Sequence, residues 1–271
     1  MYSYLDELEA KSIYIFREAY SLVKLMAAMW SVGKDSTAML WLARKAFLGR
    51  VPFPVCLLDT GMEMDEVYNM RDRLIDDWQL DCINQPCPPE NDLDQDLPPN
   101  ARAAMRKTEG LKNLMREQGF QGIACGIRRD EQGLRAKERV FSPRDANGKW
   151  DFKNQPPELW DQYNTQIPEG GHLRIHPLLH WTELDIWRYH LREGIEFCPL
   201  YLAREDKETG KMMRYRSLGE KNITFPVPSN ASSIEEIIAE LETSKISERA
   251  GRSIDTETED SFERLREKGY M

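Results

Sequence analysis

The 271-residue sequence lacks several features that mark whole classes of proteins. No apolar run approaches the roughly 18 residues needed to cross a bilayer, and residues 1–10 are polar and acidic, unlike a secretion signal. The five cysteines form no CxxC pair, so neither a disulfide framework nor a zinc or iron–sulfur site is indicated. The four histidines include no HxxxH pair on one predicted helix, which argues against a metal site. We therefore expect a cytoplasmic protein without a membrane segment.

The sequence also lacks an excess of positively charged residues. The formal net charge is −9 and the sequence pI is about 5.2, which argues against a chain that wraps nucleic acid by bulk charge. Basic residues nevertheless cluster at 128–144 and at 211–216. Such a cluster is either a solvated face or a basic pocket for an anionic substrate on an acidic body, and composition does not separate the two.

The hydrophobic pattern alternates between strands and helices. It predicts helices at 4–23, 38–47, 63–78, 111–118, 182–192 and 234–241, and strands at 25–30, 55–58, 122–125 and 175–178. The helix that ends at 192 is expected to be capped by Thr182 with Asp185, and the helix at 234–241 by Ser232 or Ser233. The Pro- and Asp-rich segment 87–100 is expected to be a loop. The fold class is therefore α/β, with a doubly wound parallel sheet flanked by helices.

Three polar loops follow predicted strands at Ser31, Asp59 and Gly126. In open α/β sheets, ligands bind beyond the carboxyl ends of the strands. We therefore expect these three loops to form one site.

The first of these loops has the composition of a phosphate-binding loop. It reads SVGKDS over residues 31–36 and lies between a predicted buried strand and a helix, whose free N–H groups and dipole attract anions. Ser31 and Ser36 offer hydroxyls, Gly33 permits close approach of the backbone, and Lys34 adds a positive charge. The GxxxxGK[ST] loop of kinases is absent, which disfavours cleavage between the β- and γ-phosphates. We expect Asp35 and Ser36 to be exposed on this loop.

The loop resembles the SxGKDS pyrophosphate loop of N-type ATP pyrophosphatases. Further motifs resemble the small subunit of bacterial two-subunit ATP sulfurylases, and the resemblance covers nearly the whole chain. These motifs are YLDELEA at 4–10, DTG at 59–61, RRDE at 128–131, RAKER at 135–139, WTE at 181–183, DIW at 185–187, PLY at 199–201 and SER at 247–249.

The resemblance implies an adenine nucleotide α-hydrolase-like fold that is shared with phosphoadenylyl-sulfate reductases. It divides the chain into an ATP pyrophosphatase domain at 1–228 and an irregular extension at 229–271 that contacts a partner or a second copy. It also implies an enzyme that transfers AMP from ATP to sulfate with Mg²⁺ and releases pyrophosphate. The implied partner is a GTPase large subunit, and a homo-oligomer is expected.

Site residues follow from the same resemblance. ATP would be held by Ser31, Gly33, Lys34, Asp35, Ser36, Thr37, Asp59, Gly126 and Arg128, with Asp59 as the Mg²⁺ ligand. The catalytic residues would be Lys34, Asp35, Arg128, Arg129 and Cys125. Positive charge would come from Lys34, Arg128, Arg129, Arg135, Lys137 and Arg139.

Cys125 leaves a second function open, because it stands where the resembled family usually has glycine. A thiol beside the ATP site could hold a persulfide if the chain were the ATP pyrophosphatase of a DNA phosphorothioation system, supplied by a cysteine desulfurase. Its thiolate would be favoured by Arg128 and Arg129. The other reading of Cys125 is a small buried hydrophobe at a strand end. A phosphoadenylyl-sulfate reductase is disfavoured because no cysteine follows Cys198, and a non-enzymatic binding module because the phosphate loop is intact.

Overall fold

The computed structural model describes residues 3–92, 99–131, 133–207, 209–244 and 248. Within those ranges, no helix combines the length and the apolar character that a membrane span requires. The predicted SER motif at 247–249 contributes only Glu248 to the description, since Ser247 and Arg249 lie outside the described residues.

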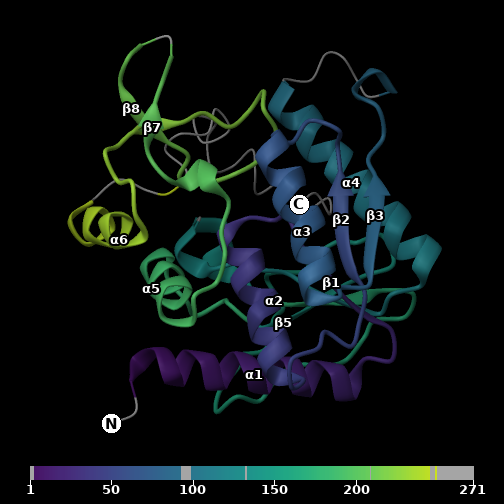
Figure 1. The fold of residues 1–271 in the computed structure, drawn as a ribbon. Coiled ribbons are helices and arrows are strands. Elements are labelled where there is room, and N and C mark those ends of the chain that lie inside the picture. Colours follow the sequence, from purple (N-terminus) through teal and green to yellow (C-terminus); the bar gives the residue numbers. More distant parts are fainter. Residues whose placement is uncertain (1–2, 93–98, 132, 208, 245–247, 249–271) are drawn as a thin grey trace.

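A six-stranded sheet forms the centre of the molecule (Figure 1). Its strands follow the order β3-β2-β1-β4-β6-β5. Its strands are β1 (Met26–Met29), β2 (Val55–Asp59), β3 (Cys82–Pro86), β4 (Gly122–Ala124), β5 (Phe141–Arg144) and β6 (His172–Ile175). All neighbouring strands pair in parallel except β5, which runs antiparallel to β6. The predicted fold class is confirmed.

Two strands of this sheet were not expected from the sequence, and a third lies elsewhere than predicted. Both missed strands, β3 and β5, lie at the edges of the sheet and contain a proline, Pro86 and Pro143. Edge strands tolerate proline and polar residues, so they carry little of the apolar signal that identifies a buried strand. The strand predicted at 175–178 is wrong, because β6 ends at Ile175 and a turn follows.

Alternate side chains of the strands enter two separate cores. Met26, Ala28, Val55 and Ala124 belong to the larger core, while their neighbours Ala27, Cys56 and Ile123 pack in a smaller one. The helices α1 (Tyr4–Leu22), α2 (Lys34–Ala46), α3 (Asp65–Trp78) and α5 (Glu183–Glu193) contribute to the larger core, and α4 (Pro99–Gln118) contributes Leu111 and Leu114 to the smaller one. Helices therefore cover both faces, as a doubly wound sheet requires.

Local capping chemistry fixes where the later helices begin. Thr182 and Asp185 form a capping box at the start of α5, as predicted. Ser233, the second of the two candidate serines, accepts a hydrogen bond from the backbone N–H of Glu236 and caps α6 (Ile234–Thr243). The helix predicted at 111–118 is the last part of α4, which already begins at Pro99.

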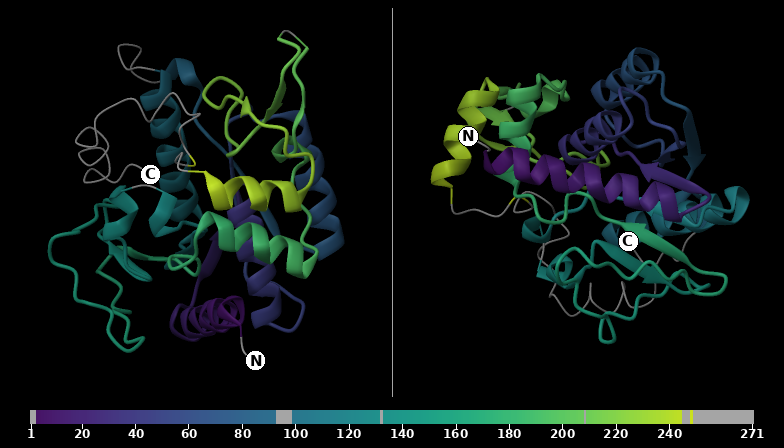
Figure 2. Two further views of the ribbon diagram at one scale, coloured as in Figure 1. Left: turned by 90° about the vertical axis from the view of Figure 1, so that its left-hand side faces the viewer. Right: turned by 90° about the horizontal axis from the view of Figure 1, so that it is seen from below.

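A small antiparallel sheet and α6 lie beside the main sheet. The small sheet contains β7 (Arg204–Glu205), β8 (Met212–Arg214) and β9 (Val227–Pro228), and it was not expected from the sequence. Figure 2 shows α6 alongside α5, and the buried Ile237 of α6 joins the larger core. The domain boundary at 228 remains a prediction.

Four short 3-10 helices complete the described elements: η1 (Glu90–Asp92), η2 (Arg129–Glu131), η3 (Gly133–Lys137) and η4 (Pro199–Tyr201).

The order of the strands locates the expected ligand crevice. From β1 the chain proceeds to β2 and β3 on one side and later to β4 and β6 on the other. The reversal of strand order between β1 and β4 is the topological switch point, where doubly wound sheets bind their ligands. Loop 31–36 follows β1 and Gly126 follows β4 closely, so both lie at this point.

Candidate active site

A cavity of about 360 Å³ opens at the switch point. Its lining includes Ser31 after β1, Asp59 at the end of β2 and Gly126 after β4, so the expectation that three loops form one site is confirmed. The cavity extends from Val67 and Tyr68 of α3 on the β2 side to Arg174 of β6 on the other. Its size lies within the range of small-molecule binding sites, and its position is the one where doubly wound sheets bind their ligands.

Hydrogen bonds within the phosphate loop close it on itself. The Ser36 hydroxyl accepts from the backbone N–H of Ser31 at 3.2 Å, lies 3.1 Å from the Ser31 hydroxyl and donates to the Gly33 carbonyl at 3.2 Å. Val32 has φ +59°, a left-handed conformation that is strained for a β-branched residue. The loop therefore has a fixed, strained shape that presents the first turn of α2 to the cavity.

Gly126 is required for the close contact between the β4 loop and α2. A Cβ at this position would lie 3.0 Å from the Cα and 3.1 Å from the backbone nitrogen of Ser36. Because these are backbone atoms at the start of a helix, they cannot move aside easily. The glycine brings the two loops together at the switch point.

The phosphate loop is more buried than the sequence indicated. Ser36 is 6% exposed and Lys34 only 1%, and Asp35 is partly buried, so the expectation that Asp35 and Ser36 lie exposed on the loop is wrong. Tyr201 of η4 covers the loop, because its hydroxyl accepts a hydrogen bond from the backbone N–H of Lys34 at 3.0 Å. From α5, Nε2 of His190 lies 2.8 Å from the Lys34 carbonyl oxygen.

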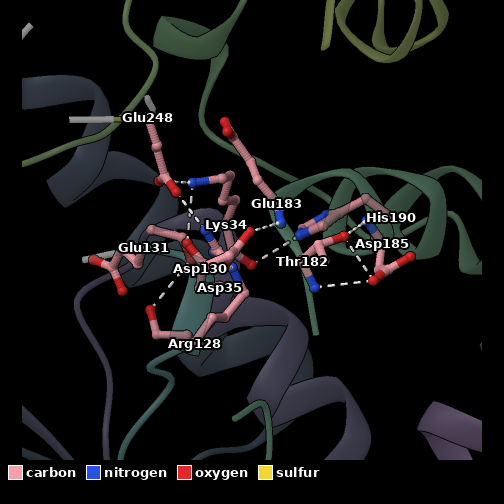
Figure 3. A network of polar contacts seen from close by, with 12 residues as sticks. Lys34, Asp35, Arg128, Asp130, Glu131, Thr182, Glu183, Asp185, His190 and Glu248 are labelled. Atoms are coloured by element: carbon pink, nitrogen blue, oxygen red, sulfur yellow. Dashed lines mark hydrogen bonds and ion pairs between the residues drawn. The ribbon is translucent and has the colours of Figure 1, made fainter. Parts of the chain in front are cut away.

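Four charged side chains converge at the loop (Figure 3), and three of them, Lys34, Asp35 and Glu248, also line the cavity. Lys34 forms ion pairs with Asp35, at 3.0 Å, and with Glu248. Arg128 forms ion pairs with the same two carboxylates and, at 2.9 Å, with Asp130. Burial alone would raise the pKa of Glu248, but Arg128 and Lys34 outweigh it and hold that pKa well below the usual value. We call Lys34, Asp35, Arg128 and Glu248 the loop cluster.

Three of the predicted site residues do not line the described cavity. Thr37 is fully buried and its hydroxyl accepts a hydrogen bond from the Trp30 indole at 3.1 Å. Arg128 reaches the cavity only through its partners in the loop cluster. Arg129 points elsewhere, with Nη1 3.0 Å from Nδ1 of His180. Of the six basic residues expected to supply positive charge, the lining includes Lys34 and Arg135.

Asp59 is held in place by three hydrogen bonds. Its carboxylate accepts from the backbone N–H of Gly61 at 2.8 Å, the Tyr68 hydroxyl at 2.9 Å and the Asn84 amide at 3.0 Å. Burial alone would raise the pKa of Asp59, but these hydrogen bonds lower it below the usual value. Asp59 therefore faces the cavity as a charged carboxylate.

The environment of Cys125 differs from the predicted one. The thiol lines the cavity, but burial raises its pKa, and the cations that oppose this increase are chiefly Arg174 and Arg144. The expectation that Arg128 and Arg129 favour its thiolate is wrong, because Arg128 is turned toward the loop cluster and Arg129 toward His180.

Near Cys125, a buried ion pair joins Glu138 to Arg144 at 2.9 Å. The Ser142 hydroxyl also donates to Glu138 at 2.8 Å. Burial would raise the pKa of Glu138, but Arg144 leads the interactions that lower it to about 2. Glu138 is therefore charged and neutralises Arg144.

This pair should make stability depend on pH. Since the pKa of Glu138 is lowered on folding, its contribution to stability is complete above about pH 4.5 and is lost as the pH falls toward 2. The stability difference between wild type and Glu138→Gln should therefore shrink by about 1.4 kcal/mol per pH unit below 4.5. Urea unfolding at several pH values measures this stability difference. Glu205→Gln, at an exposed position, is the control. A difference that stays constant from pH 6 to pH 3 would contradict the assignment.

Sequence reasoning gave no role to several residues of the site. Glu248 and Tyr201 were named only as members of motifs, and their contacts with the loop span 214 and 167 residues of sequence, which local patterns do not reveal. Arg174 was missed because the strand that carries it was predicted to start at Ile175. The family resemblance was the only signal for Glu248 and Tyr201, and no pattern in the sequence indicated Arg174.

The fold and the site together define a nucleotide-binding α/β protein, with a strand–loop–helix phosphate site at its switch point. Residues 25–226 match the phosphoadenosine phosphosulfate reductase domain family. The chain is 40% identical to sulfate adenylyltransferase subunit 2 of Pseudomonas paraeruginosa, over 99% of this chain and 98% of that protein. The subunit 2 protein of Pseudomonas fluorescens is equally similar, at 40% identity over the same shares. The chain therefore belongs to the phosphoadenosine phosphosulfate reductase domain family and, within it, to the sulfate adenylyltransferase subunit 2 proteins.

Solved structures share the fold at low sequence identity. FMN adenylyltransferase of Candida glabrata in complex with ATP has a TM-score of 0.55 at 18% identity, covering 87% of this chain and 71% of that one. Phosphoadenylyl-sulfate reductase of Candida auris, in a phosphate complex, has a TM-score of 0.53 at 14% identity, covering 82% of this chain and 96% of that one. The architecture is therefore one that known proteins share.

Proposed function

We propose that this chain is an adenylyltransferase that binds ATP and transfers its AMP moiety to sulfate, with release of pyrophosphate. The observation that carries the proposal is the phosphate loop that lines the cavity at the switch point, in a chain that is 40% identical to sulfate adenylyltransferase subunit 2 over nearly its full length. The β- and γ-phosphates of ATP would contact the first turn of α2, where backbone N–H groups and Lys34 attract anions.

The two ends of the cavity support an orientation for ATP. On the β2 side, Leu58, Val67 and Tyr68 provide an apolar surface for the nucleoside. On the β4 and β6 side, Cys125 and Arg174 line the remaining space. An acceptor bound there lies across the phosphate loop from the nucleoside, so that it can approach the α-phosphorus.

The proposed reaction is an in-line displacement. A sulfate oxygen forms a bond to the α-phosphorus, and the bond from that phosphorus to the bridging oxygen breaks. Pyrophosphate leaves with the bonding electron pair, and Lys34 stabilises the charge that develops on it. The residues of the cavity bind and orient the reactants, and no covalent intermediate with the protein is needed.

Mg²⁺ is part of the proposal because a magnesium ion commonly binds through one carboxylate and the substrate phosphates. The described residues include no cluster of three His, Cys, Asp or Glu side chains that could hold a metal by themselves. Asp59 is charged and faces the cavity, so it fits a metal ion that arrives with ATP. When bound, such an ion neutralises charge on the phosphates.

The reverse reaction provides the test. The chain, purified with any subunit that it retains, is incubated with adenylyl sulfate, pyrophosphate and Mg²⁺, and ATP is measured by luciferase light emission. ATP that forms only when both substrates are present supports the proposal. Absence of ATP, with ATP binding intact, would exclude sulfate as the acceptor. A GTPase large subunit as partner and a homo-oligomeric, cytoplasmic enzyme remain part of this proposal.

The alternative function, activation of a DNA phosphate for sulfur insertion, depends on Cys125. Its support is the position of the thiol on the cavity wall. The raised pKa counts against a resting thiolate, since the thiolate is the form that accepts sulfur. The 40% identity to subunit 2 proteins also favours sulfate.

Cys125→Ser separates the two functions. For a sulfate adenylyltransferase we expect activity within about threefold of wild type, because the thiol has no covalent role. For a sulfurating enzyme the variant should keep ATP cleavage and lose sulfur transfer from a cysteine desulfurase. Mass spectrometry after incubation with a desulfurase and cysteine should show no added sulfur on the wild-type Cys125 peptide; a gain of one sulfur there would favour the alternative.

A further inference from the structure

We infer that Arg174 forms the centre of a binding subsite for a tetrahedral oxyanion at the β6 end of the cavity. This inference rests on the proposed function for the identity of the anion, which is free sulfate. The subsite consists of the Arg174 guanidinium, the Cys125 thiol and the His176 ring, with Trp150 beside them on the cavity wall.

Charge balance at this end of the cavity leaves one positive charge without a partner. Arg144 is neutralised by Glu138, at 2.9 Å, and Arg135 forms an ion pair with Glu131. For Arg174, no carboxylate of the described chain lies within ion-pair distance, and its buried Nε has no hydrogen-bond partner there. A buried donor that lacks an acceptor is costly, and a bound anion would remove that cost.

The groups around Arg174 do not compete for it. Burial lowers the pKa of His176 to about 4, so this ring is neutral near pH 7. Its Nδ1 lies 2.7 Å from the Arg139 carbonyl oxygen, which orients the ring. Arg144 packs against Trp150, with its guanidinium carbon 5.0 Å from the ring centroid. The groups around Arg174 are therefore either neutral, as His176 is, or already paired with each other, as Arg144 and Glu138 are.

Electrostatics favours this end of the cavity over another part of its wall. Glu220 also lines the cavity and is fully buried, and its carboxylate lies 3.6 Å from Lys107 and 3.8 Å from Arg106 without a hydrogen bond. A carboxylate repels an anion. Glu131 and Glu138 also line the Arg174 end of the cavity, but each forms an ion pair with an arginine, so the charge of Arg174 remains to attract an anion. Guanidinium groups also bind tetrahedral oxyanions with two parallel hydrogen bonds. The acceptor is therefore expected beside Arg174.

The position of Arg174 in the sheet suits this role. It lies next to the last residue of β6 and pairs in register with Ile123 of β4, two residues before Cys125. The carboxyl ends of β4 and β6 meet at the edge of the sheet where ligands bind. Strand positions hold a side chain more precisely than loop positions do.

Direct binding of inorganic sulfate tests the subsite without requiring turnover. Titration calorimetry with sodium sulfate is performed in the presence of α,β-methylene-ATP at constant ionic strength. We expect saturable binding to wild type, weakened about tenfold to a hundredfold in Arg174→Gln, which loses the charge-assisted hydrogen bonds. Arg174→Lys should recover part of the loss. Arg188→Gln, on the surface of α5 and paired with Glu242, should bind as wild type does.

The outcomes separate this inference from the proposed function. Weakened sulfate binding in Arg174→Gln, with unchanged analogue binding and an unchanged melting temperature, supports the subsite even if no ATP forms in the reverse reaction. Equal sulfate affinity in wild type and Arg174→Gln overturns it. A short single-stranded oligonucleotide is titrated in the same way, because DNA is the acceptor in the alternative function. The inference also fails if wild type shows no saturable sulfate binding or binds only this oligonucleotide. If Arg174→Gln does not fold, the comparison is made with Arg174→Lys.

Discussion

Lys34→Met should lower the rate of pyrophosphate release by about 10² to 10³-fold, because a fixed charge that stabilises the leaving group is removed. Lys34 is suited to this role, since it lines the cavity and its ammonium group is held by Asp35 and Glu248 rather than free in solvent. An ammonium group with a fixed position needs little reorganisation when charge develops on the pyrophosphate. Pyrophosphate release under saturating ATP and sulfate measures the effect.

Lys45→Met is the matched control for Lys34→Met. Lys45 lies on the same helix and also forms ion pairs with two carboxylates, Glu9 at 2.7 Å and Glu193 at 3.0 Å, but it is outside the cavity lining. This variant should keep nearly full activity. A rate for Lys34→Met within twofold of wild type, with a normal melting curve, would remove the loop charge from the mechanism.

Arg128→Gln should have the largest effect on stability, a loss of about 3 to 5 kcal/mol in the free energy of unfolding. The guanidinium is fully buried and forms ion pairs with Asp35, Asp130 and Glu248. Removing it leaves the buried Glu248 and the partly buried Asp35 without this counter-charge, which costs far more than an exposed ion pair contributes. Urea unfolding at pH 7 measures the loss.

The adjacent residue supplies the control for Arg128→Gln. Arg129 is half-buried and contacts His180 instead of the loop cluster, so Arg129→Gln should cost less than about 1.5 kcal/mol. Equal losses in the two variants would contradict the distinction between a structural Arg128 and a peripheral Arg129. Arg128→Gln should also weaken ATP binding, because Glu248 and Asp35 would lose their second cation and only Lys34 would remain to neutralise them.

The parts of the fold that were predicted from sequence are those with a strong local signal. The strands β1 and β2 are continuous apolar runs, and α1 and α3 show helical spacing of apolar residues, so their positions were predicted closely. The edge strands β3 and β5 contain proline and polar residues and depend on pairing with distant strands, which local patterns do not encode.

The site was predicted to a similar extent and for similar reasons. Loop 31–36 has a phosphate-binding composition in a strand–loop–helix context, so its place at the switch point followed from topology. The roles of Glu248 and Arg174 could not be predicted, because they depend on which buried charges acquire partners in three dimensions. The expectation that Arg128 and Arg129 favour the Cys125 thiolate failed for the same reason. These residues are close to Cys125 in the sequence, but the cations that act on its thiol in the structure are chiefly Arg174 and Arg144.

Cleavage of ATP labelled separately on the α- and γ-phosphates tests the central claim most directly. The chain is incubated with each labelled ATP, Mg²⁺ and sulfate, and the products are separated by chromatography. We predict that the γ-label appears in pyrophosphate and the α-label in adenylyl sulfate or AMP. Recovery of the γ-label as inorganic phosphate together with α-labelled ADP, in the absence of any pyrophosphatase, would contradict cleavage between the α- and β-phosphates.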